Sequence, residues 1–559
     1  MKKVSLYATI TFLLAFAALQ IFLISKTFYV DEGNNIHSTV EGYADIPFHL
    51  AMISKFAFSS HFDLADPLFY GGTIHYHFLT NLVRGLLLRV TDAWSFSILA
   101  PIYLLAVLNI TFLFLIYKKL FAHNGLAILS FLIFFFGAGT AAWPFFHTDL
   151  LSPLVTFDAK LPAQNIDFGP VLSMSFIHQQ AFFLGFFLFL SFLLLLFKIN
   201  ERSEKRFMIL AMVVLALLPF AHAHSFLATA GILVSGILCA LVRKDMQSLK
   251  RLFILLIAGI ILTVPQVYFI MNANSEITTP ESFIKFRLGW MTQPGIGAVQ
   301  FSEGTSRLLT YADFLWQNFG VILPVFAASV ACACLYFRRY LREENTTFIW
   351  FGFSALSIFL IVQFFQFQPW DYDNNKLLVY FLFFATPFMI WAITNMFAQK
   401  KWMQRMVLAL FLVFSTLSGI SDTMYRIQMQ KENLPLIFSS NARILAEYVR
   451  SRVSEDGLIL TSTHHLNPVA SLAGRPVLVG YPGWLWSSGG IDYSQREAEI
   501  QKFYKSPNAT DPIFKKYPVR YILLDPTVRS MYGTQPGDLQ KYFEPVFTAG
   551  DYILYRVAL

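Results

Sequence analysis

Long apolar runs recur through the first three quarters of the chain and constrain its fold more than any other feature. Eleven runs each come close to the ~20 residues that a helix needs to cross the hydrocarbon core of a bilayer. Only 14% of all residues are charged, whereas soluble domains carry about 25%. The pattern predicts a polytopic, mainly α-helical membrane bundle. Its predicted spans are 5–25, 95–117, 126–145, 181–197, 207–222, 225–241, 252–271, 314–337, 348–366, 377–396 and 406–422.

The placement of Lys and Arg predicts how the spans are oriented. The loops on one side hold 18 basic residues in 50 positions, and those on the other side hold 9 in 156. Basic residues concentrate in cytoplasmic loops, so the N-terminus is expected in the cytoplasm, with the first span retained as an anchor. An odd number of spans then places the C-terminus outside. The net charge of +8 is explained by these loops, so the composition does not indicate nucleic-acid binding.

From about residue 423 the composition becomes that of a soluble protein. Short runs rich in β-forming residues (458–461, 477–479, 521–524, 552–557) alternate with helical patterns (442–453, 494–504). Strands that alternate with helices predict a small α/β domain. We therefore expect a transmembrane domain at 1–422, with a long first outer loop at 26–94, and an extracytoplasmic α/β domain at 423–559.

The first outer loop carries the acidic residues that most suggest a site. Asp31 and Glu32 follow the first span directly, and Asp45 opens a segment, 46–58, whose apolar residues recur at helical spacing. This pattern predicts a helix that lies flat in the membrane interface, with Asp45 at its N-terminal end. Asp31 and Glu32 form either a second acidic pair at the site or a solvated pair beyond a span.

Asp45 and His49 lie one helical turn apart, so their side chains share a face. A carboxylate beside an imidazole can deprotonate a hydroxyl group. The alternative is that Asp45 only caps the helix and that His49 is solvated.

A second motif in the same loop, residues 69–78, contains two glycines followed by His75, Tyr76 and His77. A tight turn and a second interfacial helix at 78–90 are the favoured interpretation. A divalent metal stays an alternative here, although no two of these histidines have the i, i+4 spacing of a helical metal site. Tyr76 and His77 are taken as candidate substrate-binding residues.

The ten-residue outer loop at 367–376 holds the densest polar cluster between two spans. In it Asp371, Asp373 and Asn374 could meet sugar hydroxyls or a divalent ion, and Lys376 could meet a phosphate. Arg287, in the preceding outer loop, is a second candidate for that phosphate. The alternative for the whole cluster is a structural set of ion pairs.

Two further groups of residues stand out. His178 at the start of one span, and His222 and His224 between two others, either line a cavity or satisfy neighbouring polar groups. Residues 480–490 of the tail, rich in Gly and Pro, predict an irregular loop. This loop presents Trp484 and Trp486 either to a sugar or to packing. The chain has three cysteines, all within predicted spans, which indicate neither a disulfide framework nor a metal cluster.

Taken together, these features resemble the GT-C glycosyltransferases, integral-membrane enzymes that use polyprenyl-phosphate-linked sugars. The resemblance lies in the many-span architecture, in the long first outer loop with its Asp, and in three stretches that look like an uncharacterised bacterial branch. The WWDYG-type motif of oligosaccharyltransferases and the D-E-x-H-F-G run of protein O-mannosyltransferases are both missing from the sequence. The three stretches are YADIPFHLAMISKF (43–56), FQPWDYDNNKLLVY (367–380) and GRPVLVGYPGWLWSSGGIDY (474–493).

The resemblance implies a hexosyl- or pentosyltransferase that acts at the outer face and inverts the anomeric carbon, with Asp45 as general base. The implied partners are a polyprenyl-phosphate sugar, the bilayer, and a glycan, lipid or protein acceptor. No cofactor is implied with certainty. A transporter or flippase of a lipid-linked or polar solute is the alternative, although transporters place their binding groups near the bilayer midplane. Neither the sugar nor the acceptor follows from the sequence.

Overall fold

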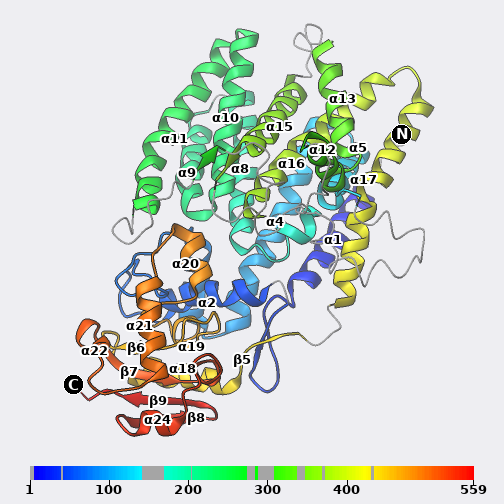
Figure 1. Cartoon of the computed structure of the whole chain (residues 1–559). Helices are drawn as coiled ribbons and strands as arrows, with labels where there is room; N and C mark the ends of the chain where they lie inside the picture. The colour runs from blue at the N-terminus through cyan, green and yellow to red at the C-terminus, as the bar shows by residue number, and fades with distance from the viewer. Residues whose placement is uncertain are drawn as a thin grey trace. The chain divides into compact units, whose positions relative to one another are not determined.

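The computed structural model of the chain describes residues 5–39, 42–140, 169–202, 204–272, 284–286, 307–335, 346–367, 372–429 and 434–558. These residues are mainly helical (Figure 1). They form two compact units that are interleaved in the sequence. Unit 1 comprises residues 1–23, 104–264 and 282–432, and unit 2 comprises residues 24–103, 265–281 and 433–559.

Most long helices belong to unit 1. Eight described helices are long and apolar enough to cross a membrane, and a ninth span results if the α12–α13 pair, bent by 98°, is counted as one. The predicted many-span helical bundle is therefore confirmed, while the number eleven stays a prediction. The helices of this bundle, long and short, are α1 (Leu6–Ile24), α4 (Trp94–Phe121), α5 (Asn124–Phe136), α8 (Gln180–Arg202), α9 (Lys205–Ala221), α10 (Ala223–Arg243), α11 (Met246–Asn272), α12 (Arg307–Phe319), α13 (Ile322–Leu335), α15 (Thr346–Phe364), α16 (Leu378–Met396) and α17 (Lys401–Met429).

The core of unit 1 surrounds α16. Every side chain from Leu378 to Ile393 is buried, which is the pattern of a helix enclosed by other helices on all sides. Helices α5, α13, α15 and α17 pack against it. Phe rings fill the contacts, as between Phe383 and Phe189, whose centroids are 5.2 Å apart. The shorter elements of unit 1 are α7 (Val171–Ser175), β3 (Lys285–Phe286), β4 (Phe365–Gln366) and the 3-10 helix η4 (Tyr372–Leu377).

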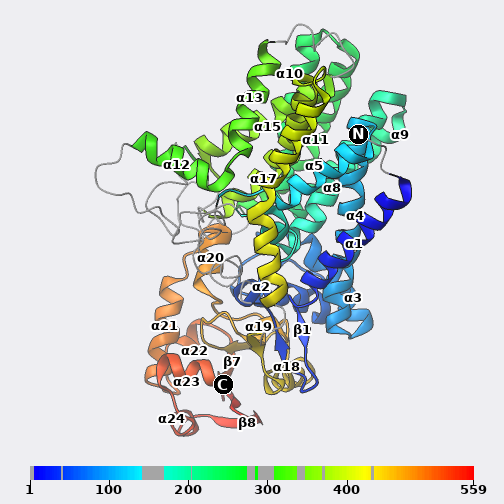
Figure 2. The ribbon, with the colours of Figure 1, turned by 90° about the vertical axis from the view of Figure 1, so that its right-hand side faces the viewer.

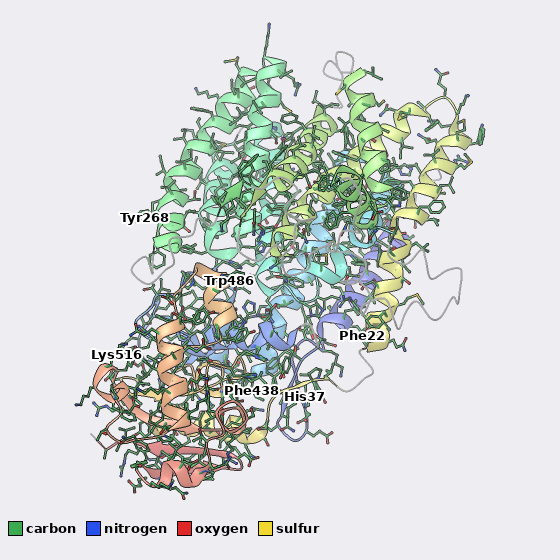
Figure 3. The ribbon with its side chains drawn as sticks, in the orientation of Figure 1. Phe22, His37, Tyr268, Phe438, Trp486 and Lys516 are labelled. Atoms are coloured by element: carbon green, nitrogen blue, oxygen red, sulfur yellow. The ribbon has the colours of Figure 1, made fainter. Side chains whose placement is uncertain are left out.

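Unit 2 combines the first outer loop with the C-terminal tail. Strands β1 (Tyr29–Val30) and β2 (Ile36–His37) form a hairpin, and β5 (Leu436–Phe438) of the tail pairs with β2. Figure 3 labels His37 and Phe438 on these neighbouring strands. Two described segments from opposite ends of the chain thus share one sheet.

Helix α2 (Gly42–Phe58) lies at the centre of unit 2. It packs against α3 (Leu79–Thr91) and against α19 (Pro468–Ser471) of the tail. The expected helix at 46–58 is therefore present, but its apolar residues are buried inside the unit instead of being open to a membrane. The second expected helix, 78–90, is also present as α3, and it does expose apolar side chains: Val83, Leu86 and Val90.

The rest of the tail is a four-stranded sheet flanked by helices (Figures 1 and 2). Its order is β6-β7-β9-β8, with β6 parallel to β7 and the other pairs antiparallel. The expected α/β organisation is confirmed, although 477–479 makes only isolated bridges and β8 was not predicted. The elements are α18 (Ser440–Arg452), β6 (Leu458–Leu460), α20 (Pro482–Gly489), α21 (Ser494–Lys505), α22 (Ile513–Lys516), β7 (Val519–Leu524), α23 (Pro526–Tyr532), α24 (Pro536–Gln540), β8 (Glu544–Ala549) and β9 (Tyr552–Arg556).

Residues 480–490 differ from the expected irregular loop. They form the short helix α20, which begins at Pro482 and ends where Gly490 takes a left-handed conformation (φ 63°). Pro is favoured in the first turn of a helix, and Gly is favoured just beyond its end. The Gly and Pro residues that suggested a loop are therefore the start and stop signals of a helix.

Candidate active site

Asp45 occupies the first turn of α2, and its side chain is exposed. A carboxylate is stabilised there, because the amide groups at a helix N-terminus carry partial positive charge. Pro47 lies further inside α2 and, because Pro has no N–H group, it donates no hydrogen bond to the preceding turn. The first turn of α2 thus presents a carboxylate to solvent.

His49, one turn further along α2, points into the unit. Its side chain is buried, and its Nδ1 lies 3.2 Å from Oδ1 of Asn81 on α3. The imidazole therefore joins α2 to α3 and helps to hold the helix that carries Asp45. A direct catalytic role for His49 beside Asp45 stays a prediction.

Several aromatic rings pack around the N-terminal part of α2, which carries Asp45. The Phe48 ring lies 4.9 Å from Tyr76 and 5.4 Å from Trp484, centroid to centroid, and Tyr43 lies 4.9 Å from His465. We call this set, which draws on the first outer loop and on the tail, the aromatic cluster. It consists of Tyr43, Phe48, Tyr76, His465, Tyr481 and Trp484.

The two tryptophans of α20 differ in exposure. Trp484 is only 9% exposed, whereas Trp486 is 39% exposed (Figure 3). Trp484 therefore packs the tail against α2. Trp486 lies two residues further along α20 and is the more exposed of the two. His77 stacks on Tyr76 with 3.7 Å between ring centroids.

Backbone contacts hold the tail against the loop that carries Tyr76. The Val477 and Gly480 amides donate to the carbonyl groups of Pro67 and Leu68, at 3.0 Å and 2.6 Å. A Cβ atom on Gly480 would lie 3.0 Å from the Leu68 oxygen, so only Gly fits this approach comfortably. Arg496 adds a hydrogen bond of 2.7 Å to the Tyr70 carbonyl.

Sequence reasoning missed Asp66, which is paired with His75. Both side chains are buried, with Oδ2 and Nδ1 4.0 Å apart, and burial raises the pKa of Asp66. They line a small pocket together with Phe48, Tyr76 and Trp484, and its free space suits a water molecule better than a sugar ring. The Gly71-Gly72 turn brings Asp66 and His75 together. This pair of glycines was the sequence signal from which the contact could have been predicted.

Asp31 and Glu32 lie in the turn of the β1–β2 hairpin. The Asp31 carboxylate accepts hydrogen bonds from the backbone and side-chain amides of Asn35, at 2.8 Å and 3.0 Å, and lies 3.0 Å from His37 Nε2. These bonds, led by that from the Asn35 side chain, lower the pKa of Asp31 to about 2. Asp31 therefore stabilises the hairpin, and Glu32 is exposed.

The other candidates belong to unit 1. Lys376 is half-buried in η4, and the buried Asn374 accepts a 2.6 Å hydrogen bond from the Phe367 amide. His178 lies 3.4 Å from Arg426, which forms an ion pair of 3.0 Å with the buried Asp422, a cluster that sequence reasoning missed. Arg287, Asp371 and the Asp373 side chain lie outside the described residues.

His222 also belongs to a buried polar network. Its Nδ1 lies 2.8 Å from Ser225 Oγ, which is in turn 2.5 Å from the Tyr380 hydroxyl. Within the described parts of the chain, no group of three or more His, Cys, Asp or Glu side chains is arranged to hold a metal ion.

No family model and no curated protein matches the sequence, but solved structures match its fold. The archaeal oligosaccharyltransferase AglB from Archaeoglobus fulgidus, in complex with an inhibitory peptide and a dolichol-phosphate, superposes with a TM-score of 0.50 at 12% identity, over 99% of this chain and 74% of AglB. The same enzyme tethered to an acceptor peptide gives a TM-score of 0.51 at 10% identity, with the same coverage. ArnT from Cupriavidus metallidurans, bound to undecaprenyl phosphate, gives 0.50 at 11% identity, over 99% of both chains.

These matches extend over nearly the whole chain and not over a single motif. At 10–12% identity they establish the fold. Together with the apolar helices, they show that this chain is a multi-pass membrane protein with the GT-C fold shared by AglB and ArnT.

Proposed function

We propose that this protein is a membrane glycosyltransferase that moves a sugar from a polyprenyl-phosphate donor to an acceptor hydroxyl group at the extracytoplasmic face. The observation that carries the proposal is the exposed Asp45 carboxylate at the start of α2, beside the aromatic cluster, in a chain with the GT-C fold. The solved structures with dolichol-phosphate and undecaprenyl phosphate support a lipid-linked donor.

In the proposed reaction Asp45 acts as the general base. Its carboxylate takes the proton of the acceptor hydroxyl as that oxygen attacks the anomeric carbon. The bond from this carbon to the phosphate oxygen breaks on the opposite side, so the sugar inverts and the polyprenyl phosphate leaves. Negative charge grows on the departing phosphate, and we assign Lys376 and Arg287 to stabilise it.

Asp45 suits this task better than Asp31. A base must be open to its substrate, and the Asp45 side chain is exposed, whereas Asp31 is half-buried in the β1–β2 hairpin. His49 holds α2 to α3 and so fixes the position of that carboxylate.

The tail would help to bind the acceptor. Tyr481, a member of the cluster, and Trp486, two residues after Trp484 on α20, are 37% and 39% exposed, and flat apolar rings of this kind suit the apolar faces of a sugar. The acceptor is a glycan, lipid or protein hydroxyl. The proposed topology places the N-terminus in the cytoplasm and both Asp45 and the tail outside, as the distribution of Lys and Arg predicts.

The experiment is transfer of radiolabelled sugar from a panel of polyprenyl-phosphate donors by the protein in proteoliposomes that also contain candidate acceptor lipids and glycans. The wild type is compared with Asp45→Asn and with a matched control, Asp456→Asn, which removes an exposed carboxylate from the same unit. We expect transfer by the wild type and the control, and a loss of about 10²-fold or more in Asp45→Asn.

Equal transfer by Asp45→Asn would refute Asp45 as the base and move that role to Asp31 or Glu32. If no donor gives transfer while the same proteoliposomes carry a lipid-linked sugar across the bilayer, the glycosyltransferase proposal fails and the transporter takes its place.

A further inference from the structure

A second pocket in unit 2 lies between α18, the β1–β2 hairpin and the start of α4. It encloses about 380 Å³, its open mouth included, and its walls include Asn34, Trp94, Arg443, Glu447 and Arg450. No residue of the aromatic cluster lines it. The Arg450 guanidinium stacks on Phe58 at the end of α2, and Asp45 lies 13 residues earlier on the same helix. Thirteen helical residues span about 20 Å, so Asp45 and this pocket are about that far apart.

Two arginines give this pocket its character. Arg443 and Arg450 are seven residues apart on α18, so they share a face two turns apart. Arg443 donates a 3.1 Å hydrogen bond to the Asn34 carbonyl, and the Arg450 guanidinium lies 4.1 Å above the centre of the Phe58 ring. Burial lowers the pKa of both groups.

Neither arginine has a carboxylate within ion-pair distance among the described residues. Glu447 lies between them and lines the same pocket, but it is exposed and makes no such pair there either. The nearby Arg475 is already paired with Glu455, at 3.0 Å. Glu447 and Asp92 both act on the two arginines through space, but neither is within ion-pair distance of them, so the guanidinium N–H groups can still donate to a bound anion.

The surroundings of the pocket indicate where that anion comes from. Trp94 is the first residue of α4, a helix that is apolar enough to cross a membrane, and Trp is enriched where such helices leave the bilayer. The preceding helix, α3, exposes Val83, Leu86 and Val90 at a spacing of three and four residues, which forms an apolar stripe. A cationic pocket at the start of an apolar helix, in a unit that also exposes an apolar stripe, matches an amphiphilic anion.

We propose that Arg443 and Arg450 bind the phosphodiester of an anionic membrane lipid. The forked N–H donors of arginine fit phosphate oxygens, and a phosphodiester offers such oxygens with one negative charge. The acyl chains would lie along the apolar stripe of α3. This site does not depend on glycosyl transfer, because its residues and those proposed for catalysis are different.

The test is the thermal stability of the full chain, purified in detergent, while dioctanoyl phosphatidylglycerol is titrated. A ligand that binds the folded state raises its Tm. We expect a rise for the wild type and for Arg452→Gln, an exposed arginine at the end of the same helix. In Arg450→Gln the apparent Kd should be about tenfold weaker.

Two further variants guard against a folding defect in Arg450→Gln. Arg443→Gln should weaken binding in the same way, and Glu447→Gln should tighten it, because it removes the opposing charge. A merely structural role of these residues does not produce opposite effects on the apparent Kd.

The proposal is overturned if dioctanoyl phosphatidylcholine, which has no net charge, raises Tm as much as phosphatidylglycerol does. It is also overturned if inorganic phosphate at the same concentration has the same effect, since the source is then a free anion. Unchanged binding in both arginine variants would likewise refute it.

Discussion

The ring of Phe48 packs against that of Trp484 at a centroid distance of 5.4 Å, although one residue lies in the first outer loop and the other in the tail. Phe48 is three residues from Asp45 on α2. The C-terminal tail therefore contributes directly to the surroundings of the proposed base. It also follows that a change in the tail should affect the site through packing.

Trp484→Ala should destabilise the protein by about 3 kcal/mol, because it removes a large buried side chain and leaves a cavity. Its ring contacts Phe48 and Tyr481. The measurement is unfolding of the purified protein followed by circular dichroism or by intrinsic fluorescence. Trp486→Ala is the matched comparison, since 39% of this residue is exposed against 9% of Trp484, and it should destabilise the protein less than Trp484→Ala does. Equal effects of the two would contradict the packing described here.

Gly474→Ala should cost about 2 kcal/mol or more. Gly474 has a left-handed conformation (φ 66°), and a Cβ atom there would lie 2.4 Å from the Ser54 carbonyl oxygen of α2. Strain and a clash with backbone act together. Gly537→Ala meets no atom within 4 Å and should be neutral or slightly stabilising. A melting curve of each variant measures the difference in stability. A neutral Gly474→Ala would show that α2 and the tail do not pack this closely.

Stability should fall as the pH drops from about 6.5 to about 4. Burial, aided by the charge of His464, lowers the pKa of His465 to about 4. In this range the unfolded chain binds a proton that folded His465 excludes, so acid favours unfolding. His465→Asn should reduce the change of Tm with pH, although the His464 pKa is lowered too. His61 is exposed, so His61→Asn should leave the change of Tm with pH as it is in the wild type. If His465→Asn also leaves it undiminished, the assignment to His465 is contradicted.

Asp422→Asn should destabilise unit 1 by about 3 kcal/mol. Asp422 is buried and pairs with Arg426, which also lies close to His178. The variant removes the carboxylate that balances the largely buried Arg426 charge, and breaking a buried ion pair in this way is costly. Glu201→Gln is the control, because Glu201 pairs with Lys119 and Lys198 at the surface, and such pairs contribute up to about 1 kcal/mol. Thermal unfolding in detergent measures both, and a difference below about 1 kcal/mol would argue against a buried ion pair.

Much of the fold could be predicted because its signals are local. Apolar runs of sufficient length located the helices of unit 1, and alternation of β-rich and helical patterns located β6, β7, β9, α18 and α21. The strand β8 was missed because its sequence begins with Glu544 and Pro545 and does not alternate clearly. The prediction of an irregular loop at 480–490 was wrong because Gly and Pro, which often interrupt regular structure, here begin and end a helix.

The candidate site was harder to predict, because its parts come from distant segments. Sequence reasoning proposed Asp45, and the structure shows it exposed at the start of a helix. The Asp66–His75 pair and the Asp422–Arg426 pair had no local pattern that distinguishes them from solvated residues.

The sequence by itself determined the class of protein, the existence of its helices and the helical position of Asp45, because hydrophobic length and periodicity act over a few turns. Only the tertiary structure decided that α2 is buried and that the tail packs on the first outer loop. Those contacts depend on close approaches such as Gly480 to Leu68 and Gly474 to Ser54. They are set by the shapes of two surfaces that meet, and shape complementarity between distant segments leaves no pattern in either segment alone.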